Sequence, residues 1–153
     1  LPAWDRTQAK SQAAEVSAVL SGNDYGLFMQ EMYGNTPHAW SPDLSGIARW
    51  RFAVNVFTRM RMVDAEGALD LDYKGELPDA PVDLAAWFDY PTRALAGQRI
   101  VFGHWSALGL MKKNDVTALD TGCIWGGALT ALCLDNGRVT QVPARCAYQT
   151  ISD

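Results

Sequence analysis

The feature that most constrains the fold is a change in the spacing of apolar residues near residue 60 of the 153-residue chain. Before that point, apolar positions recur at the three- to four-residue spacing of amphipathic helices. After it, they gather in short runs separated by glycine, proline, asparagine and aspartate. We therefore expect residues 1–60 to be mainly helical, 61–142 to form mainly strands and loops, and 143–153 to be a tail. Helices followed by strands are typical of an α+β protein.

Two helices are expected before residue 33. Asp5 followed by Gln8 resembles a capping box, and the helix it opens is expected to run to Leu20. The sequence Ser21-Gly22-Asn23 then ends it. A second, shorter helix is expected from Tyr25 to Met32.

A third helix is expected from Pro42 to Thr58, because Ser41 is a good N-cap residue and proline suits the first helical position. At 100° per residue, one apolar stripe should face the core and a polar stripe should lie beside it. The apolar stripe comprises Ile47, Trp50, Val54 and Phe57. The polar stripe comprises Arg51, Asn55 and Arg59.

Arginine is concentrated at this helix in a chain whose net charge is −4. The arginines between residues 49 and 61 are Arg49, Arg51, Arg59 and Arg61. They suit bidentate contacts to phosphate oxygens, but they also suit a solvated face that pairs with Asp64, Asp70 or Asp72. Spacing alone favours the solvated face. The absence of acidic residues within 47–62 weakens that interpretation, and both stay open.

The second segment predicts several strands. A hairpin is expected between 61–63 and 69–73, and further strands at 99–102, 116–119 and 128–134. Asp135-Asn136-Gly137 is a tight turn that returns the chain through 138–142. Residues 84–88 are expected to form one or two helical turns.

Composition and charge exclude several classes of protein. The chain is 48% hydrophobic and 20% charged, which is typical of a folded domain. No apolar run reaches the roughly 18 residues that would span a bilayer, and the net charge argues against a nucleic-acid coat protein. Three cysteines without a CxxC motif disfavour a disulfide framework and favour a cytoplasmic location. The start at Leu1, with neither Met nor signal peptide, predicts a piece of a longer protein.

Two loops that follow predicted strands hold the residues best suited to chemistry. They are Phe102-Gly103-His104-Trp105 and the run from Leu119 to Gly127. A histidine at a strand end can ligate a metal ion, although a buried, hydrogen-bonded histidine is the more frequent case. Asp120-Thr121-Gly122 can equally be a simple turn, and Trp125 can simply cap the core.

Several standard sites are absent from the sequence. HExxH, GxGxxG and GxSxG do not occur. Gly122 and Gly127 have the spacing of a phosphate-binding loop, but Ala128 stands where its lysine should be. No complete pair of nucleophile and base is recognisable.

Taken together, four strings resemble the symmetrical diadenosine tetraphosphatases of bacteria, which are metallophosphoesterases related to the Ser/Thr protein phosphatases. The strings are Met32-Tyr33-Gly34-Asn35 with Trp40-Ser41-Pro42, Asn55-Val56-Phe57-Thr58-Arg59-Met60-Arg61, Phe102-Gly103-His104-Trp105, and Ala118-Leu119-Asp120-Thr121-Gly122-Cys123 with Trp125-Gly126-Gly127. They occur in the family's order and at its approximate spacing. The resemblance covers the chain from about Leu1 to Val142.

The family's GDxHG, GDxxxRG, GNHD and HAG motifs are missing from this chain. The resemblance therefore implies the C-terminal portion of a single metallophosphoesterase domain. Its fold would be the C-terminal half of a four-layer α/β/β/α sandwich. The missing N-terminal half of the same enzyme would be its partner.

The resemblance also implies an activity. In the complete enzyme, two divalent cations, manganese or a similar metal, activate a water that cleaves diadenosine tetraphosphate to two ADP. Capped RNA is an alternative substrate. We expect the isolated chain to be inactive. A non-catalytic nucleotide- or polyphosphate-binding module, or a truncated remnant, are the alternative interpretations.

The resemblance assigns roles to individual residues. His104 would ligate one metal, and Asp120 would orient the imidazole of His104. Arg59 and Arg61 would contact the polyphosphate, with Arg51 and Asn55 behind them. Trp105 and Trp125 would stack on adenine or shape the cleft.

Overall fold

The computed structural model describes residues 1–149, and the chain divides into two compact units. The first unit comprises Leu1–Lys74 and Pro78–Ala96, and the second comprises Gly75–Leu77 and the chain from Gly97 onward. Within the described residues, helices come first and strands later, so the α+β class is confirmed.

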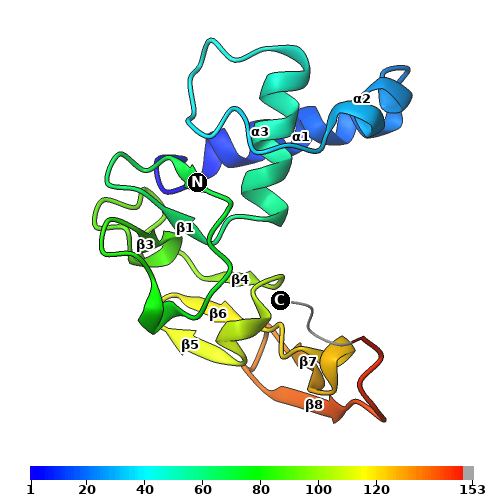
Figure 1. Ribbon diagram of the computed structural model, residues 1–153, viewed down its shortest axis with the longest axis vertical. Helices are drawn as coiled ribbons and strands as arrows, with labels where there is room; N and C mark the ends of the chain where they lie inside the picture. The colour runs from blue at the N-terminus through cyan, green and yellow to red at the C-terminus, as the bar shows by residue number, and fades with distance from the viewer. Residues whose placement is uncertain (150–153) are drawn as a thin grey trace. The chain divides into compact units, whose positions relative to one another are not determined.

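The first unit contains the helices α1 (Arg6–Ser21), α2 (Tyr25–Glu31) and α3 (Gly46–Thr58), with α1 packed against both of the others (Figure 1). The predicted start of the first helix is confirmed, because the backbone N–H of Gln8 donates to Asp5 Oδ1 at 2.7 Å. The helix ends at Gly22, whose N–H donates to the Val19 carbonyl at 3.2 Å. These bonds satisfy backbone groups that a helix leaves unpaired at its ends.

The third helix begins at Gly46, so its predicted start at Pro42 is wrong. The Ser41 hydroxyl does accept a backbone bond, from the N–H of Asp43 at 3.1 Å. That bond closes a turn, in which the Leu44 N–H donates to the Ser41 carbonyl at 3.2 Å. Gly46 has a φ of +52°. An α-helix cannot continue through such a residue, so the helix has to start there.

The predicted core stripe of α3 is also wrong. The helix residues that are buried are Phe52, Ala53, Asn55 and Val56. The predicted stripe is only partly buried, and the side chain of Phe57 is 46% exposed. At 100° per residue, Phe52 and Val56 lie opposite Trp50 and Val54. The buried face is thus on the other side of the helix.

The helix makes contacts on both sides, which explains the error. The Trp50 ring meets Phe28 of α2 edge-on at 6.1 Å, and its Nε1 donates to Glu15 of α1 at 2.9 Å. On the other side, Phe52 contacts Trp4 and Trp40 at ring distances of 6.0 and 5.6 Å. When apolar residues lie around most of a helix, its sequence does not indicate which side is more deeply buried.

A three-stranded antiparallel sheet completes the first unit. It has the order β2 (Leu69–Asp70), β1 (Met62–Val63), β3 (Ala85–Ala86). The predicted hairpin of β1 and β2 is confirmed, with Val63 opposite Leu69. The helical turns expected over 84–88 are replaced in part, because Ala85–Ala86 are extended and pair with β1. Only Trp87–Asp89 form a short 3-10 turn.

The second unit contains a sheet with the order β4 (Ile100–Phe102), β6 (Val116–Ala118), β5 (Met111–Lys113). β4 and β6 are parallel, and β5 and β6 are antiparallel. The predictions of β4 and β6 are confirmed. β5 was not predicted, because it is short and carries Lys112 and Lys113. Its signal is the two-residue turn Asn114-Asp115, in which Asn114 has a φ of +51°.

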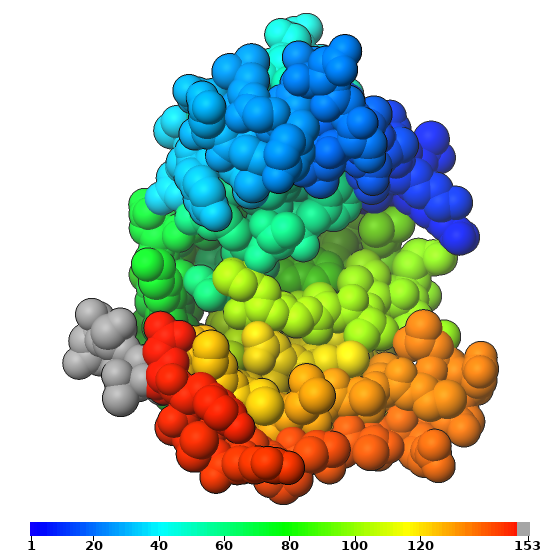
Figure 2. Space-filling model, turned by 90° about the vertical axis from the view of Figure 1, so that its right-hand side faces the viewer, coloured from blue at the N-terminus to red at the C-terminus, as the bar shows by residue number. Residues whose placement is uncertain are grey.

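The hairpin of β7 (Ala128–Leu132) and β8 (Val139–Pro143) confirms the strand and turn predictions after residue 127. Gly137, in the predicted turn, has a φ of +72°, and its N–H donates to the Cys133 carbonyl at 2.9 Å. Figure 2 shows the hairpin and the segment after it, in orange and red, open on the surface. No helix among the described residues is long and apolar enough to cross a membrane.

The cap of α1 generates a stability prediction. Asp5→Ala removes the acceptor for the Gln8 N–H and should lower the free energy of unfolding by about 1 kcal/mol. Asp24→Ala is the matched control, because Asp24 precedes α2 without a side-chain capping bond. Urea denaturation followed by circular dichroism measures both. Equal losses in the two variants would contradict the capping role of Asp5.

Candidate functional site

Arg51 joins both ends of the loop between α2 and the cis Thr36-Pro37 bond. Its Nε donates to the Glu31 carbonyl at 2.7 Å, its Nη2 donates to the same carbonyl, and its Nη1 donates to the Thr36 carbonyl at 3.1 Å. Gly34 packs over this side chain with a φ of +137°. The guanidinium of Arg51 therefore donates to backbone carbonyls, and these bonds position the loop at 31–36.

Asn55 and Arg59 extend this contact toward the end of α3. Asn55 is 1% exposed, and its Nδ2 donates to the Gly34 carbonyl at 2.9 Å. Arg59 Nη1 donates to Asn55 Oδ1 at 3.0 Å and to the Gly34 carbonyl at 3.3 Å, and its Nη2 donates to Asn35 Oδ1 at 2.9 Å. The polar stripe predicted on this helix thus forms one cluster with the loop.

Arg61 differs from the other arginines of the cluster. Its Nε is buried and has no hydrogen-bond partner among the described residues. Burial of the guanidinium, and secondarily the positive charge of Arg59, lower the pKa of Arg61. Its backbone is held in place, because the Trp87 N–H donates to the Arg61 carbonyl at 3.0 Å. A half-buried cation beside a second cation favours the approach of an anion.

Acidic partners neutralise only half of the arginine cluster. Arg49 forms an ion pair with Glu15 at 2.8 Å and also lies over the Trp40 ring, 5.0 Å from its centroid. Arg51 approaches a Glu31 carboxylate oxygen at 3.5 Å. Within residues 1–149, neither Arg59 nor Arg61 has an ion pair. The partners of Arg49 and Arg51 come from α1 and α2, so the sequence near α3 did not reveal them.

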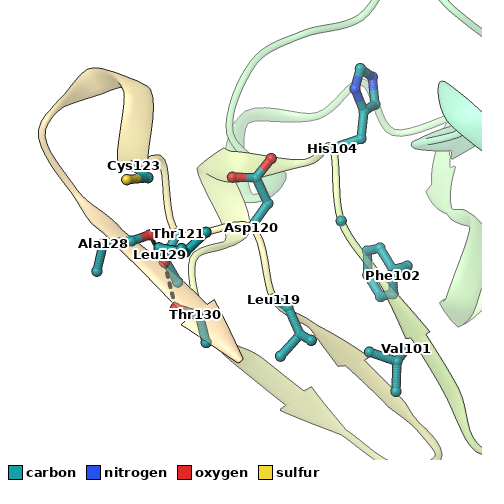
Figure 3. Close-up of a pocket in the computed structure, with 11 residues that line it drawn as sticks. Val101, Phe102, His104, Leu119, Asp120, Thr121, Cys123, Ala128, Leu129 and Thr130 are labelled. Carbon is teal, nitrogen blue, oxygen red and sulfur yellow. Dashed lines mark hydrogen bonds between the residues drawn. The ribbon is translucent and has the colours of Figure 1, made fainter. Parts of the chain in front are cut away.

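In the second unit, His104 and Asp120 line one pocket because each lies two residues after one of two parallel strands (Figure 3). β4 and β6 pair Phe102 with Ala118, and the Leu119 N–H donates to the Phe102 carbonyl at 2.9 Å. The carboxyl ends of adjacent parallel strands lie at the same edge of a sheet. The prediction that both loops begin at strand ends is confirmed.

The pocket has a volume of about 390 Å³, and most of its lining is apolar. It is lined by Val101, Phe102, Gly103, His104, Leu119, Asp120, Thr121, Cys123, Ala128, Leu129 and Thr130. Figure 3 shows the imidazole of His104 and the carboxylate of Asp120 extending past the strand ends. His104 has a φ of +70°, which costs a non-glycine residue about 1–3 kcal/mol. Such strain is concentrated at functional sites in proteins.

The loop after Asp120 is fixed by backbone contacts. Asp120 Oδ1 accepts a bond from the Gly122 N–H at 3.1 Å, and Gly127 N–H donates to the Gly122 carbonyl at 3.0 Å. A Cβ at position 127 would lie 2.0 Å from the Thr121 carbonyl oxygen, so only glycine fits there. The spacing of Gly122 and Gly127 therefore reflects a tight backbone contact and not a phosphate-binding loop.

The two tryptophans assigned to the cleft differ in exposure. Trp105 is 2% exposed, so its ring faces are covered and only the cleft-shaping role suits it in this conformation. Trp125 is 38% exposed and ends the short 3-10 turn Cys123–Trp125. Stacking on a base stays a prediction for Trp125.

The described residues by themselves do not fit a metal centre. Residues 1–149 contain no group of three or more histidine, cysteine, aspartate or glutamate side chains that could hold a metal ion. His104 and Asp120 have the chemistry of ligands for manganese or zinc. Two such side chains are too few for a closed coordination sphere, so a centre built on them needs ligands from elsewhere. The assignment of His104 as a ligand stays a prediction.

The sequence did not reveal how Asn35 and Asp72 join the arginine cluster. Asn35 Nδ2 donates to Asp72 Oδ1 at 2.6 Å, and its Oδ1 accepts from Arg59, so Asp72 reaches Arg59 through Asn35. Three aspartates were expected as ion-pair partners of the arginines. Asp64 and Asp70 accept bonds from nearby backbone N–H groups instead, and Asp72 accepts its bond from Asn35. Gly34 and Asn35 belong to the first of the strings that carry the resemblance, but the resemblance assigned them no role.

Several known proteins are similar in sequence to this chain. No family model matches the chain. A symmetrical bis(5′-nucleosyl)-tetraphosphatase of Chromobacterium violaceum is 47% identical over 152 residues, which are 99% of this chain and 54% of the relative. Proteins of the same name from Methylobacillus flagellatus and Legionella pneumophila are 46% identical over 147 residues and 50% identical over 143 residues.

The chain spans about half the length of these curated relatives. The matched part extends over 93–99% of the chain and includes both units. Over nearly its whole length, the chain is therefore similar to proteins named symmetrical bis(5′-nucleosyl)-tetraphosphatase.

Proposed function

We propose that this chain is the C-terminal, substrate-clamping part of a hydrolase that cleaves diadenosine tetraphosphate to two ADP. Its two units would then belong to the C-terminal half of a four-layer metallophosphoesterase sandwich. The similarity to tetraphosphatases over nearly the whole chain supports the reaction class. The observation that carries the clamping role is the neighbouring pair Arg59 and Arg61, neither of which has an ion pair within residues 1–149.

The pair suits a polyphosphate for an electrostatic reason. Keeping the half-buried Arg61 charged beside Arg59 costs free energy, which an anion would offset by supplying the missing acceptor. Guanidinium groups bind phosphate oxygens with charge-assisted, often bidentate hydrogen bonds. As the phosphoryl group reacts, these bonds would stabilise the charge that develops on its oxygens. Arg51 and Asn55 would act behind the pair by holding the loop at 31–36.

The second unit would supply His104 as one ligand of the metal centre that the resemblance implies, with Asp120 next to it. The remaining ligands would come from the part of the protein that the chain does not include. This division gives a separate role to each unit: Arg59 and Arg61 bind substrate, and the strand-end pocket contributes to the metal centre. Trp125 would contact a base.

The first test compares the chain with a full-length chimaera, in which it replaces the 152 aligned residues of the Chromobacterium violaceum relative. With Mn²⁺, the chimaera should release ADP from diadenosine tetraphosphate, and the isolated 153-residue chain should not. Chromatographic separation of the nucleotides measures both. An inactive chimaera that folds would contradict the proposed reaction. Turnover by the isolated chain would show that it holds a complete site.

The arginine pair gives the second test. In the chimaera, Arg61→Ala should lower kcat/KM on the order of 100-fold, because it removes a donor that stabilises the transition state. Arg59→Ala should act in the same direction. Arg138→Ala is the control, since Arg138 lies in the exposed turn of the β7–β8 hairpin. If kcat/KM of Arg61→Ala is as little changed as that of Arg138→Ala, Arg61 does not contact the substrate.

The third test concerns His104. His104→Ala in the chimaera should reduce the metal bound per chain, measured by elemental analysis after gel filtration. The control is His38→Ala, because His38 is an exposed residue of the first unit. Normal metal content in His104→Ala would contradict the assignment of His104 as a metal ligand.

A further inference from the structure

We infer that Asp72 is a positioning residue for Arg59, acting through the side-chain amide of Asn35. The inference rests on the proposed function, because it concerns the guanidinium that would contact the polyphosphate. Asp72 lies two residues after β2, and its carboxylate is exposed at the surface. The sequence suggested Asp72 only as an ion-pair partner of the arginines, and the names of the relatives assign it no role.

A continuous chain of hydrogen bonds joins the three residues. Asn35 Nδ2 donates to Asp72 Oδ1 at 2.6 Å, and Asn35 Oδ1 accepts from Arg59 Nη2 at 2.9 Å. On its other side, Arg59 Nη1 donates to Asn55 Oδ1 at 3.0 Å. Acceptors therefore hold both terminal nitrogens of the guanidinium: the Gly34 carbonyl and Asn35 Oδ1 from the loop at 31–36, and Asn55 Oδ1 from α3.

The carboxylate matters because an amide has two orientations. A carboxylate only accepts hydrogen bonds, so Asp72 requires the NH₂ group of Asn35 to face it. The amide oxygen then faces Arg59, which only donates. In the opposite orientation, the NH₂ group would face the donors of Arg59, and two oxygens would face each other at Asp72. Asp72 thus selects the orientation of Asn35 that holds Arg59.

The alternative is that Asp72 acts only as a nearby negative charge. The two possibilities predict opposite results for a polyanion. Removing a negative charge near the site should strengthen polyanion binding if only Coulomb interactions matter. Removing it should weaken binding if the carboxylate is needed to orient Asn35 and Arg59. The substitution Asp72→Asn separates the two effects, because the new amide oxygen can still accept the bond from Asn35 without the charge.

The first experiment needs no ligand and uses the 153-residue chain. Nitrogen-15 relaxation of the Arg59 side-chain N–H reports its motion in the wild type and three variants. Asp72→Ala should increase the motion of Arg59, and Asp72→Asn should restore most of the order. Glu66→Ala is the matched control, because Glu66 lies in the turn of the same hairpin and its exposed carboxylate has no hydrogen bond among the described residues. Unchanged Arg59 motion in Asp72→Ala would overturn the inference.

The second experiment uses the chimaera and diadenosine tetraphosphate. Asp72→Ala should lower kcat/KM about fivefold, mainly through KM, Asp72→Asn should recover most of the loss, and Glu66→Ala should cause no loss. Combining Asp72→Ala with Arg59→Ala should lower kcat/KM no further than Arg59→Ala alone, since Asp72 acts through Arg59. A higher kcat/KM in Asp72→Ala would show a purely Coulombic effect and overturn the inference. A chimaera without activity would contradict the proposed function, while the relaxation experiment still decides the role of Asp72.

Discussion

The position of the loop at 31–36 in the first unit depends on the hydrogen bonds that Arg51 donates to the Glu31 and Thr36 carbonyls. The loop between these residues has no strand or helix partner of its own, so its carbonyl groups need donors from elsewhere. α3 supplies them, and it does so from one polar stripe. Because the same stripe carries Arg59, the hydrogen bonds that order the loop also fix the position of the guanidinium. The polar stripe of α3 thus both orders the loop and places the charge of Arg59.

The distribution of charge follows from this arrangement. Arg49 and Arg51 are neutralised by Glu15 and Glu31, which belong to other helices. Arg59 is held by neutral acceptors, which orient a guanidinium without cancelling its charge. A net charge of −4 for the whole chain therefore coexists with a local positive potential at the end of α3. Orientation without neutralisation is what a polyanion site requires, because a fixed carboxylate in the same place would compete with the ligand.

Sequence patterns predicted the features that depend on neighbouring residues. The capping bond of Asp5, the turn at Asp135-Asn136-Gly137 and the strand ends before His104 and Asp120 are local in this sense. The predicted start of α3 was wrong because a glycine can adopt a positive φ in several kinds of turn, so Gly46 does not mark a helix start in the sequence. The buried face of α3 failed because the helix packs on two sides, which only the tertiary contacts of Phe52 and Trp50 reveal.

The same distinction applies to the candidate site. Two parallel strands that end side by side explain why His104 and Asp120 share a pocket. The strands and the loops after them were predicted from the sequence, but their parallel pairing was not. The partners of Arg59 outside α3 were not visible in the sequence, because Asn35 lies 24 residues from Arg59 and Asp72 lies 37 residues from Asn35. An amide between a cation and a carboxylate has no sequence signature, since each residue alone is an ordinary surface group. Only the fold gives the amide a fixed direction, with its NH₂ group toward Asp72 and its oxygen toward Arg59.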